Sequence, residues 1–385
     1  MGDWRRSVDQ VQARAIERAG LTDFGADSFR EGLEILMRAS HDVPAPPSAV
    51  DRMEDIAVNG LTNRLRLTDY VKRHPEVLDV PVEKPLFIIG MPRSGTTVAS
   101  YVVGQDPARR SLLVWEAWES VPPPTTETLK TDPRCLARVA AQQAEWAKTP
   151  GMVRPHVEFE DGPTECLRLH SQDFKAIMFE GPLPVKEYSR WMMDTDMTSA
   201  YAYQKMALQV LQSKAPGRWS LKMPSHALHV EALYRVFPDA RIVWTHRDPY
   251  EALASLFSMK SASWMRNTGD PNVEWLREHY PRQLGEHVNR PMRLRERIGQ
   301  DKIFDLYYGD MLRDPIGVMQ RLYAWAGDEF TPQAEAAMRQ WLADNPQGRF
   351  GKHSYNLEQF GLTQAALKPF FSDYLDVHGK VLEAA

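Results

Sequence analysis

The stretch Pro85-Leu-Phe-Ile-Ile-Gly90-Met-Pro-Arg93-Ser94-Gly95-Thr96-Thr97 decides the fold of this chain. Its apolar run over 86–89 contains β-branched residues and predicts a buried parallel strand. The residues from Thr96 to about Gly104 predict a helix that begins directly after a short loop. Such a strand, loop and helix N-terminus bind anions, because loop N–H groups point inward and the helix dipole favours negative charge.

The spacing of two glycines relates this loop to a known phosphate-binding pattern. Gly90-x-x-x-x-Gly95 matches the P-loop of nucleotide-binding proteins. The P-loop requires Lys after its second glycine, whereas this chain has Thr96 there and places its cation earlier, at Arg93. The sequence therefore predicts an anion site that differs from the usual nucleoside triphosphate site.

Composition limits the class of protein. A chain of 385 residues is long enough for one large α/β domain with insertions, or for two domains. The 47 basic and 51 acidic residues leave a net charge of −4, which gives no basic footprint for a nucleic-acid partner. Cys135 and Cys166 cannot form a disulfide framework, so a reducing compartment is expected. Without a secretory signal or a run of roughly 20 apolar residues, we expect a cytoplasmic protein with no transmembrane segment. A homo-oligomer is compatible with this composition.

The pattern after residue 85 predicts an α/β fold, a P-loop-like parallel sheet of about five strands flanked by helices. Strands separated by helices pair in parallel through right-handed crossovers, and ligands bind beyond the strands' carboxyl ends. The expected strands are 86–89, 110–115, 219–222, 240–245 and 302–308. The expected divisions are a helical N-terminal segment packed on the core (1–84), an α/β domain (85–362) with a helical insertion over the pocket (about 126–215), and a C-terminal helical tail (363–385).

Charged side chains follow the predicted strands. Arg93 lies after the first strand, Glu116 after the second, Lys222 after the third and Arg247 after the fourth. The carboxyl ends of parallel strands meet at one edge of a sheet, so these four side chains are expected to lie together. Three cations and a carboxylate beside an anion-binding loop predict a site for a multiply phosphorylated ligand.

Two of these motifs resemble those of a known family. Pro92-Arg-Ser-Gly-Thr-Thr97 resembles the 5′-phosphosulfate loop of sulfotransferases that use 3′-phosphoadenosine 5′-phosphosulfate (PAPS). Arg247, with Ser255 eight residues later, resembles their 3′-phosphate site. The resemblance is closest to a bacterial branch that shares features with tyrosylprotein sulfotransferases, and the matches run in order from 85 to about 362. Its further motifs appear here as Trp115-Glu116, Lys222-Met-Pro-Ser-His226, Tyr308-Gly-Asp310 and Gly348-Arg-Phe-Gly351-Lys-His353-Ser-Tyr355.

The resemblance implies transfer of a sulfuryl group from PAPS to a hydroxyl of a small-molecule, lipid or carbohydrate acceptor. This reaction needs in-line positioning, stabilisation of the bridging oxygen, and removal of the acceptor's proton. The transferred group carries one negative charge rather than the two of a γ-phosphate. Guanidinium, ammonium and N–H donors can therefore suffice, and no metal is expected.

The resemblance also implies roles for individual residues. Arg93 is expected to contact the 5′-phosphate and the bridging oxygen, and Lys222 to be a second cation at the transferring group. Glu116, which is 23 residues after Arg93, is the favoured base because tyrosylprotein sulfotransferases carry their catalytic glutamate at this place. Alternatively it positions Arg93 or the substrate. Cytosolic sulfotransferases use a histidine instead, and the histidines in reach by order are His156, His170 and His226.

The remaining family positions are expected to hold the donor or face the acceptor. Ser94 either donates to the donor's phosphate or caps the following helix, and the segment around Gly348 is expected to be a flap. Glu165-Cys166 resembles a family element that is expected to face the acceptor. The expected donor-binding residues are Arg93, Ser94, Gly95, Thr96, Thr97, Arg247, Ser255, Tyr308, Gly348, Arg349, Gly351 and Lys352.

Two other functions compete with this interpretation. An ATP-dependent P-loop kinase or phosphotransferase would depend on Mg²⁺, and Thr96 in place of the P-loop Lys argues against it. A nucleotide-binding interaction protein would have the site without a base. The insertion is rich in aromatic residues and Met, which indicates an apolar or aromatic alcohol, a lipid or a glycolipid as acceptor, although an amphipathic helix packed on the core has the same pattern.

Overall fold

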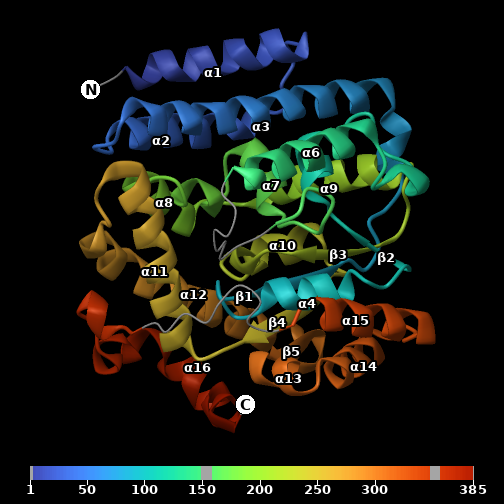
Figure 1. Cartoon of the computed structure of the whole chain (residues 1–385), viewed down its shortest axis with the longest axis vertical. Coiled ribbons are helices and arrows are strands. Elements are labelled where there is room, and N and C mark those ends of the chain that lie inside the picture. Colours follow the sequence, from blue (N-terminus) through green and yellow to red (C-terminus); the bar gives the residue numbers. More distant parts are fainter. Residues whose placement is uncertain (1–2, 149–157, 347–355, 385) are drawn as a thin grey trace.

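The computed structural model describes residues 3–148, 158–346 and 356–384, and a parallel sheet with the strand order β2-β3-β1-β4-β5 lies at its centre (Figure 1). The expected fold class, a five-stranded parallel sheet flanked by helices, is confirmed. The strands are β1 (Leu86–Gly90), β2 (Arg109–Ser111), β3 (Arg218–Lys222), β4 (Arg241–His246) and β5 (Ile303–Tyr307).

Burial on both faces explains why β1 is an unbroken apolar run. It is the middle strand of the sheet, and all five of its residues are buried. Successive side chains of a strand point to opposite faces. Leu86 and Ile88 accordingly belong to one apolar cluster, whereas Phe87 and Ile89 belong to another.

Helices cover both faces of the sheet (Figure 1). The cluster with Leu86 and Ile88 also holds residues of α4, α14 and α15, while the cluster with Phe87 holds residues of α9 to α12 and α16. These helices are α4 (Thr96–Val103), α9 (Thr198–Gln212), α10 (Val230–Val236), α11 (Pro249–Thr268), α12 (Val273–Ile298), α13 (Tyr308–Arg313), α14 (Pro315–Ala326), α15 (Pro332–Asp344) and α16 (Gln364–Ala384).

The strand expected over 110–115 is shorter than predicted. β2 ends at Ser111, and the apolar residues that follow form the helix α5 (Val114–Trp118). β2 is an edge strand that pairs with β3 alone. The Glu116 carboxylate accepts a hydrogen bond from the Leu113 amide at 2.8 Å, which closes the first turn of α5 and ends the extended backbone.

The N-terminal helices pack on the inserted helices, as Figure 1 shows at one end of the molecule. A buried polar contact joins the two parts, because Arg64 of α3 donates to Asp173 at 3.0 Å and to the Phe24 carbonyl at 2.9 Å. The N-terminal elements are α1 (Trp4–Ala19), α2 (Arg30–His41) and α3 (Pro47–Arg73), and the inserted ones include α6 (Pro133–Ala147), α7 (Leu167–His170) and α8 (Lys186–Asp194).

In the described parts of the chain, no helix has both the length and the apolar character that a bilayer crossing requires.

Candidate active site

The loop between β1 and α4 depends on its two glycines. Gly90 has φ +149° and Gly95 has φ +91°, conformations that side chains rarely adopt. A Cβ at Gly90 would lie 2.3 Å from Thr245 Oγ1, and one at Gly95 would lie 2.5 Å from Tyr308 Cδ2. The loop can therefore pack against the ends of β4 and β5 only if both positions lack a side chain.

The loop leaves several backbone donors at the start of α4 without a partner. The Ser94 amide bonds to the Met91 carbonyl at 3.2 Å, and the next bonded amide is that of Ala99, which donates to the Gly95 carbonyl at 3.2 Å. No oxygen of the described residues accepts from the amides of 95–98. Free amides at a helix N-terminus form a binding site for an anion.

Ser94 points away from these free amides, contrary to both of its expected roles. Its side chain is fully buried, donates to the Met91 carbonyl at 2.6 Å, and lies 2.6 Å from Thr245 Oγ1. Gly95, rather than Ser94, is the N-cap of α4. The Ser94 hydroxyl therefore ties the loop to the sheet, where it cannot contact a ligand held by the loop.

Residues far apart in the sequence meet beside this loop, as the strand-end pattern predicts. Arg93 Nε donates to Ser255 Oγ at 3.0 Å, and Arg247 Nη1 donates to the Arg93 carbonyl at 2.9 Å. The Arg247 guanidinium lies 4.9 Å from the centre of the Tyr308 ring. Gly95 packs on the same ring. The predicted contacts of the 5′ and 3′ ends of a donor therefore form one continuous surface.

The charges of these two arginines are only weakly neutralised. Arg93 forms no ion pair with any carboxylate of the described residues, and Arg247 pairs with Glu251 at 3.1 Å. The Glu251 side chain is 65% exposed, so water screens this ion pair. Arg93 also has φ +71°, a strained conformation for a large side chain that costs about 1–3 kcal/mol. A positively charged surface that includes a residue with a strained backbone indicates a role in binding an anion.

A cavity of about 410 Å³ opens from the loop. Arg93, Thr96, Thr97, Arg247 and Tyr308 line it at the loop. The cavity continues between the inserted helices and α11, where its walls are mainly apolar. One cavity therefore combines an anion-binding surface with an apolar compartment.

Glu165 and Lys222 form a buried ion pair at the wall of this cavity. Their charged atoms lie 2.7 Å apart, and their side chains are 12% and 3% exposed, respectively. The Cys166 amide donates to the Lys222 carbonyl at 3.0 Å, which fixes the two segments side by side. Glu165 lines the cavity, and Lys222 lies behind it. Lys222, the expected second cation, is therefore connected to the cavity by its ion pair with Glu165.

The predicted base, Glu116, does not face the cavity. It is fully buried, and its carboxylate accepts from Arg110 Nη1 at 2.8 Å and from the Leu113 amide at 2.8 Å. Its ion pair with Arg110 uses both carboxylate oxygens. Three donors of the protein itself thus already occupy this carboxylate. The expected contact with Arg93 is also absent from the described contacts, so the structure argues against both predicted roles.

Two of the histidine alternatives, His170 and His226, are also buried and do not line the cavity. His170 Nε2 lies 2.6 Å from Gln204 Oε1, and burial lowers the pKa of His170 to about 4. His226 Nδ1 lies 2.8 Å from Tyr201 Oη, and burial lowers the pKa of this imidazole well below its usual value. Both rings contribute to core packing. His156 lies outside the described residues.

The expected flap residues Gly348, Arg349, Gly351 and Lys352 also lie outside the described residues, so their predicted donor contacts stay a prediction.

Three polar residues in the apolar compartment of the cavity were not predicted from the sequence. Lys260 and Gln283 line it, and Glu180 lies directly behind them. One signal was present in the sequence: Lys260 interrupts an otherwise apolar helix face, four residues after Leu256 and three after Phe257. Gln283 lies on α12, which contains two prolines, and the sequence pattern did not predict that helix.

The comparisons with known proteins identify a family. The family model described as the sulfotransferase family matches residues 85–332. The crystal structure of sulfotransferase STF9 from Mycobacterium avium is 48% identical, with a TM-score of 0.89 and 96% of each chain covered. That of sulfotransferase STF1 from Mycobacterium tuberculosis H37Rv is 28% identical, with a TM-score of 0.83, and the match covers 95% of this chain and 98% of that one.

Curated relatives match a shorter stretch. Proteins of Mycobacterium bovis and Mycobacterium tuberculosis named omega-hydroxy-beta-dihydromenaquinone-9 sulfotransferase Stf3 are 24% identical over 164 residues. The match covers 41% of this chain and spans 40% of the length of these relatives.

Proposed function

The chain belongs to the sulfotransferase family, as its motifs predict, and we propose that it transfers the sulfuryl group of PAPS to a hydroxyl group of an apolar acceptor. The observation that carries this proposal is the meeting of Arg93, Arg247 and Ser255 beside the free amides of α4. These donors suit a ligand with two separate anionic groups. The apolar compartment suits the body of the acceptor.

The donor set fits the two anionic ends of PAPS. We assign the 5′-phosphosulfate to the free amides of 95–98 and to Arg93, whose Nη groups have no partner among the described residues. The 3′-phosphate is assigned to Arg247 and Ser255, and the adenine side to Tyr308, on which Arg247 already stacks. When bound, PAPS supplies the sulfuryl group. The chain's own residues hold its charges and keep it in line with the acceptor.

We assign removal of the acceptor's proton to Glu165 rather than to Glu116. Glu165 lines the cavity, and Oε1 bonds to Lys222, while Oε2 has no partner among the described residues. One oxygen is thereby oriented and the other is free to take a proton, which is the geometry a general base needs. Lys222 is a positioning residue in the resting state. Proton transfer to Glu165 weakens the ion pair and releases the ammonium toward the charge that develops on the donor.

The acceptor assignment rests on the cavity walls, and the names of relatives agree with it. The Stf3 proteins are named for a hydroxylated menaquinone, an alcohol with a largely apolar body. A small-molecule or lipid alcohol is therefore favoured here over a carbohydrate, because the compartment has few polar groups to bind several hydroxyls.

Titration calorimetry tests the donor site. Adenosine 3′,5′-bisphosphate, the product left after transfer, should bind more tightly than adenosine 5′-monophosphate, by about tenfold or more for one charge-assisted phosphate contact. Transfer from labelled PAPS to a cell extract should not require Mg²⁺. Equal affinity for the two nucleotides, or tighter binding of ATP than of the bisphosphate, would contradict the proposal and favour a kinase.

A further inference from the structure

The apolar compartment of the cavity has a defined far end. Leu256 and Met259 of α11 form one wall at i and i+3, and Ile177 and Met178 form the opposite wall. Lys260 and Gln283 line the same cavity and are its polar groups away from the anion loop and Glu165. A buried ammonium and a buried amide in an apolar compartment need a structural or functional reason.

The ammonium of Lys260 is incompletely satisfied. Its side chain is 9% exposed, and Nζ lies 4.6 Å and 5.6 Å from the ring centres of Tyr280 and Trp264. Among the described residues its hydrogen-bond acceptors are Glu180 Oε2 at 3.3 Å and the Glu180 carbonyl at 3.4 Å. Both are long for hydrogen bonds of a charged donor. An ammonium has three donors, and the described residues supply no acceptor for the third. Lys260 can therefore donate into the cavity.

Gln283 offers the complementary group. Its Nε2 donates to Glu180 Oε1 at 3.3 Å and lies 3.4 Å from His279 Nε2, whereas the side-chain oxygen Oε1 has no donor among the described residues. The side chain is almost wholly buried and lines the cavity. A donor from Lys260 and an acceptor from Gln283 thus lie at the same end.

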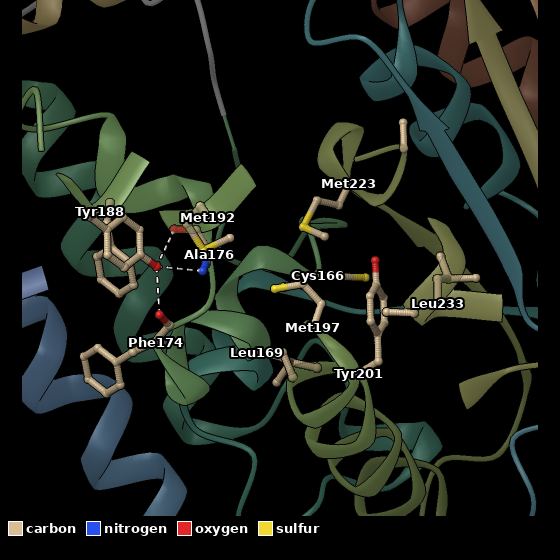
Figure 2. Packing of buried hydrophobic residues seen from close by; sticks show 14 of the residues in the cluster. Cys166, Leu169, Phe174, Ala176, Tyr188, Met192, Met197, Tyr201, Met223 and Leu233 are labelled. Carbon is tan, nitrogen blue, oxygen red and sulfur yellow. Dashed lines mark hydrogen bonds between the residues drawn. The ribbon is translucent and has the colours of Figure 1, made fainter. Parts of the chain in front are cut away.

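Hydrogen bonds from neighbouring side chains fix the position of Glu180 beside Lys260 and Gln283. Tyr280 Oη donates to Glu180 Oε2 at 2.9 Å, and Trp264 Nε1 donates to the Glu180 carbonyl at 3.1 Å. Figure 2 shows the Tyr188 hydroxyl between Phe174 and Ala176, where it donates to the Phe174 carbonyl at 2.8 Å and accepts from the Ala176 amide at 3.0 Å. This clamp fixes the turn that precedes the apolar wall, so the end of the compartment is preformed.

The charge balance selects the kind of group that can enter. Lys260 and Glu180 neutralise each other, and burial lowers the pKa of Lys260 while Glu180 opposes that shift. A carboxylate on the acceptor would be buried near the carboxylate of Glu180, and an ammonium on the acceptor would be buried near the ammonium of Lys260. Either would lose hydration without a free counter-charge. An uncharged oxygen can bond to Lys260 at no such cost.

We propose that this end is the specificity subsite of the acceptor, and that the acceptor is an apolar alcohol with a second, uncharged oxygen that bonds to Lys260 and Gln283. This inference rests on the proposed sulfotransferase function. Lys260 lies five residues beyond Ser255 on α11, a rise of about 7.5 Å along the helix axis. The subsite and the donor site therefore belong to different turns of α11. A hydroxyl satisfies both side chains, whereas a carbonyl satisfies Lys260 alone.

The first test compares straight-chain acceptors of matched and increasing length: a simple alcohol, an ω-hydroxy methyl ketone, a diol and an ω-hydroxy acid. At the best length, kcat/KM should be about tenfold higher for the ketone and the diol than for the simple alcohol, because one hydrogen bond to a charged donor is gained. The hydroxy acid should be the poorest acceptor. Either hydroxyl group of the diol can accept the sulfuryl group, and this statistical advantage is the same in every variant.

Two variants separate the contributions of the subsite. Lys260→Met alone would leave Glu180 as an unpaired buried charge, so it is combined with Glu180→Gln. This double variant should lose the preference for both the ketone and the diol over the simple alcohol, and the change should be in KM. Gln283→Leu should reduce transfer to the diol and retain the ketone preference. Met265→Leu, at an exposed position of the same helix, is the matched control.

The outcomes distinguish this inference from the proposed function. An unchanged ketone preference in the double variant, or equal losses with all acceptors, would overturn the subsite, as would no transfer to any member of the series. In each of these cases the affinity for adenosine 3′,5′-bisphosphate reports separately on the donor site. If the unmutated protein does not bind adenosine 3′,5′-bisphosphate, the proposed function itself is overturned.

Discussion

Arginines lie both at the amino edge of the sheet, where its strands begin, and at the carboxyl edge, where they end, but their environments differ. At the amino edge, Arg109, Arg218 and Arg241 begin β2, β3 and β4, and all three pair with Asp328. The Asp328 side chain is 2% exposed, and Arg241 Nη1 lies 2.8 Å from it. At the carboxyl edge, Arg93 has no described ion pair and Arg247 pairs with an exposed Glu251.

The difference shows how to tell a structural arginine from a binding one. At the amino edge a buried carboxylate already takes the place of a ligand, and the ion pairs join three strands. At the carboxyl edge free amides and a cavity replace the carboxylate. An arginine is available to an anionic ligand when its charge is not already neutralised by a buried partner.

The largest effect is expected from Arg93 at the carboxyl edge. Arg93→Ala should lower kcat by about a thousandfold, because a donor to the developing charge is lost. Thermal unfolding should change little, since the Arg93 side chain has one hydrogen bond with the described residues and a strained φ. Arg93→Lys keeps the charge without the planar guanidinium and is the matched control. Near-normal turnover of Arg93→Ala would remove Arg93 from the transfer step.

The opposite result is expected at the amino edge. Asp328→Asn should lower the free energy of unfolding by about 3–5 kcal/mol, because three arginines lose their buried counter-charge. The kcat of the folded protein should stay within the error of the unmutated value. Denaturant unfolding and turnover at low temperature measure the two quantities. A variant that is fully stable but inactive would break the proposed division between the edges.

Two glutamates extend the comparison to the interior. Glu165→Gln should lower kcat by about a hundredfold, because a general base is lost. Glu116→Gln should instead destabilise the protein, because it leaves Arg110 buried and unpaired. The reverse outcome, with Glu116→Gln folded and inactive, would restore Glu116 as the base.

The smallest effect concerns acid stability at the carboxyl edge. His378 stacks on His246 at 4.2 Å between ring centres, and burial lowers the pKa of His378 to about 3. Several charged or titratable groups face this pair: Asp305, Arg295, Tyr307 and Tyr374. Because the folded-state pKa lies below the ordinary histidine value, stability is full above about pH 6.5 and falls as the pH drops toward 3.

The expected slope is about 1.4 kcal/mol per pH unit for each histidine that stays neutral in the folded protein. His378→Phe should therefore reduce the slope measured by denaturant unfolding between pH 6 and pH 4, roughly the range in which the unfolded side chain is charged. An identical slope in the variant would show that His378 does not contribute to acid sensitivity.

The sequence predicts the centre of the fold and much of the donor site. β1 and its loop are identifiable because burial on both faces and two required glycines leave a local signal. The strand-end rule brings Arg93 and Arg247 together from distant parts of the chain, because parallel strands share one carboxyl edge. Ser255 is expected there only from the family resemblance.

The rest depends on contacts that no local pattern encodes. Glu116 follows a strand, yet the short edge strand turns it toward Arg110 instead of the cavity. The helix that carries Gln283 contains Pro281 and Pro291, which predict breaks. Glu180 and Lys260 pair across 80 residues, so their subsite emerges only from the packing of the inserted segment on α11.

We expect only the arginines without a buried counter-charge to bind the ligand. The most direct test measures the affinity for adenosine 3′,5′-bisphosphate and for adenosine 5′-monophosphate in Arg247→Ala and in Arg218→Ala. Arg247→Ala should lose about tenfold or more in affinity for the bisphosphate with little change for the monophosphate, and Arg218→Ala should keep both affinities. Equal losses for both nucleotides in Arg247→Ala, or a loss of bisphosphate affinity in Arg218→Ala, would contradict this expectation.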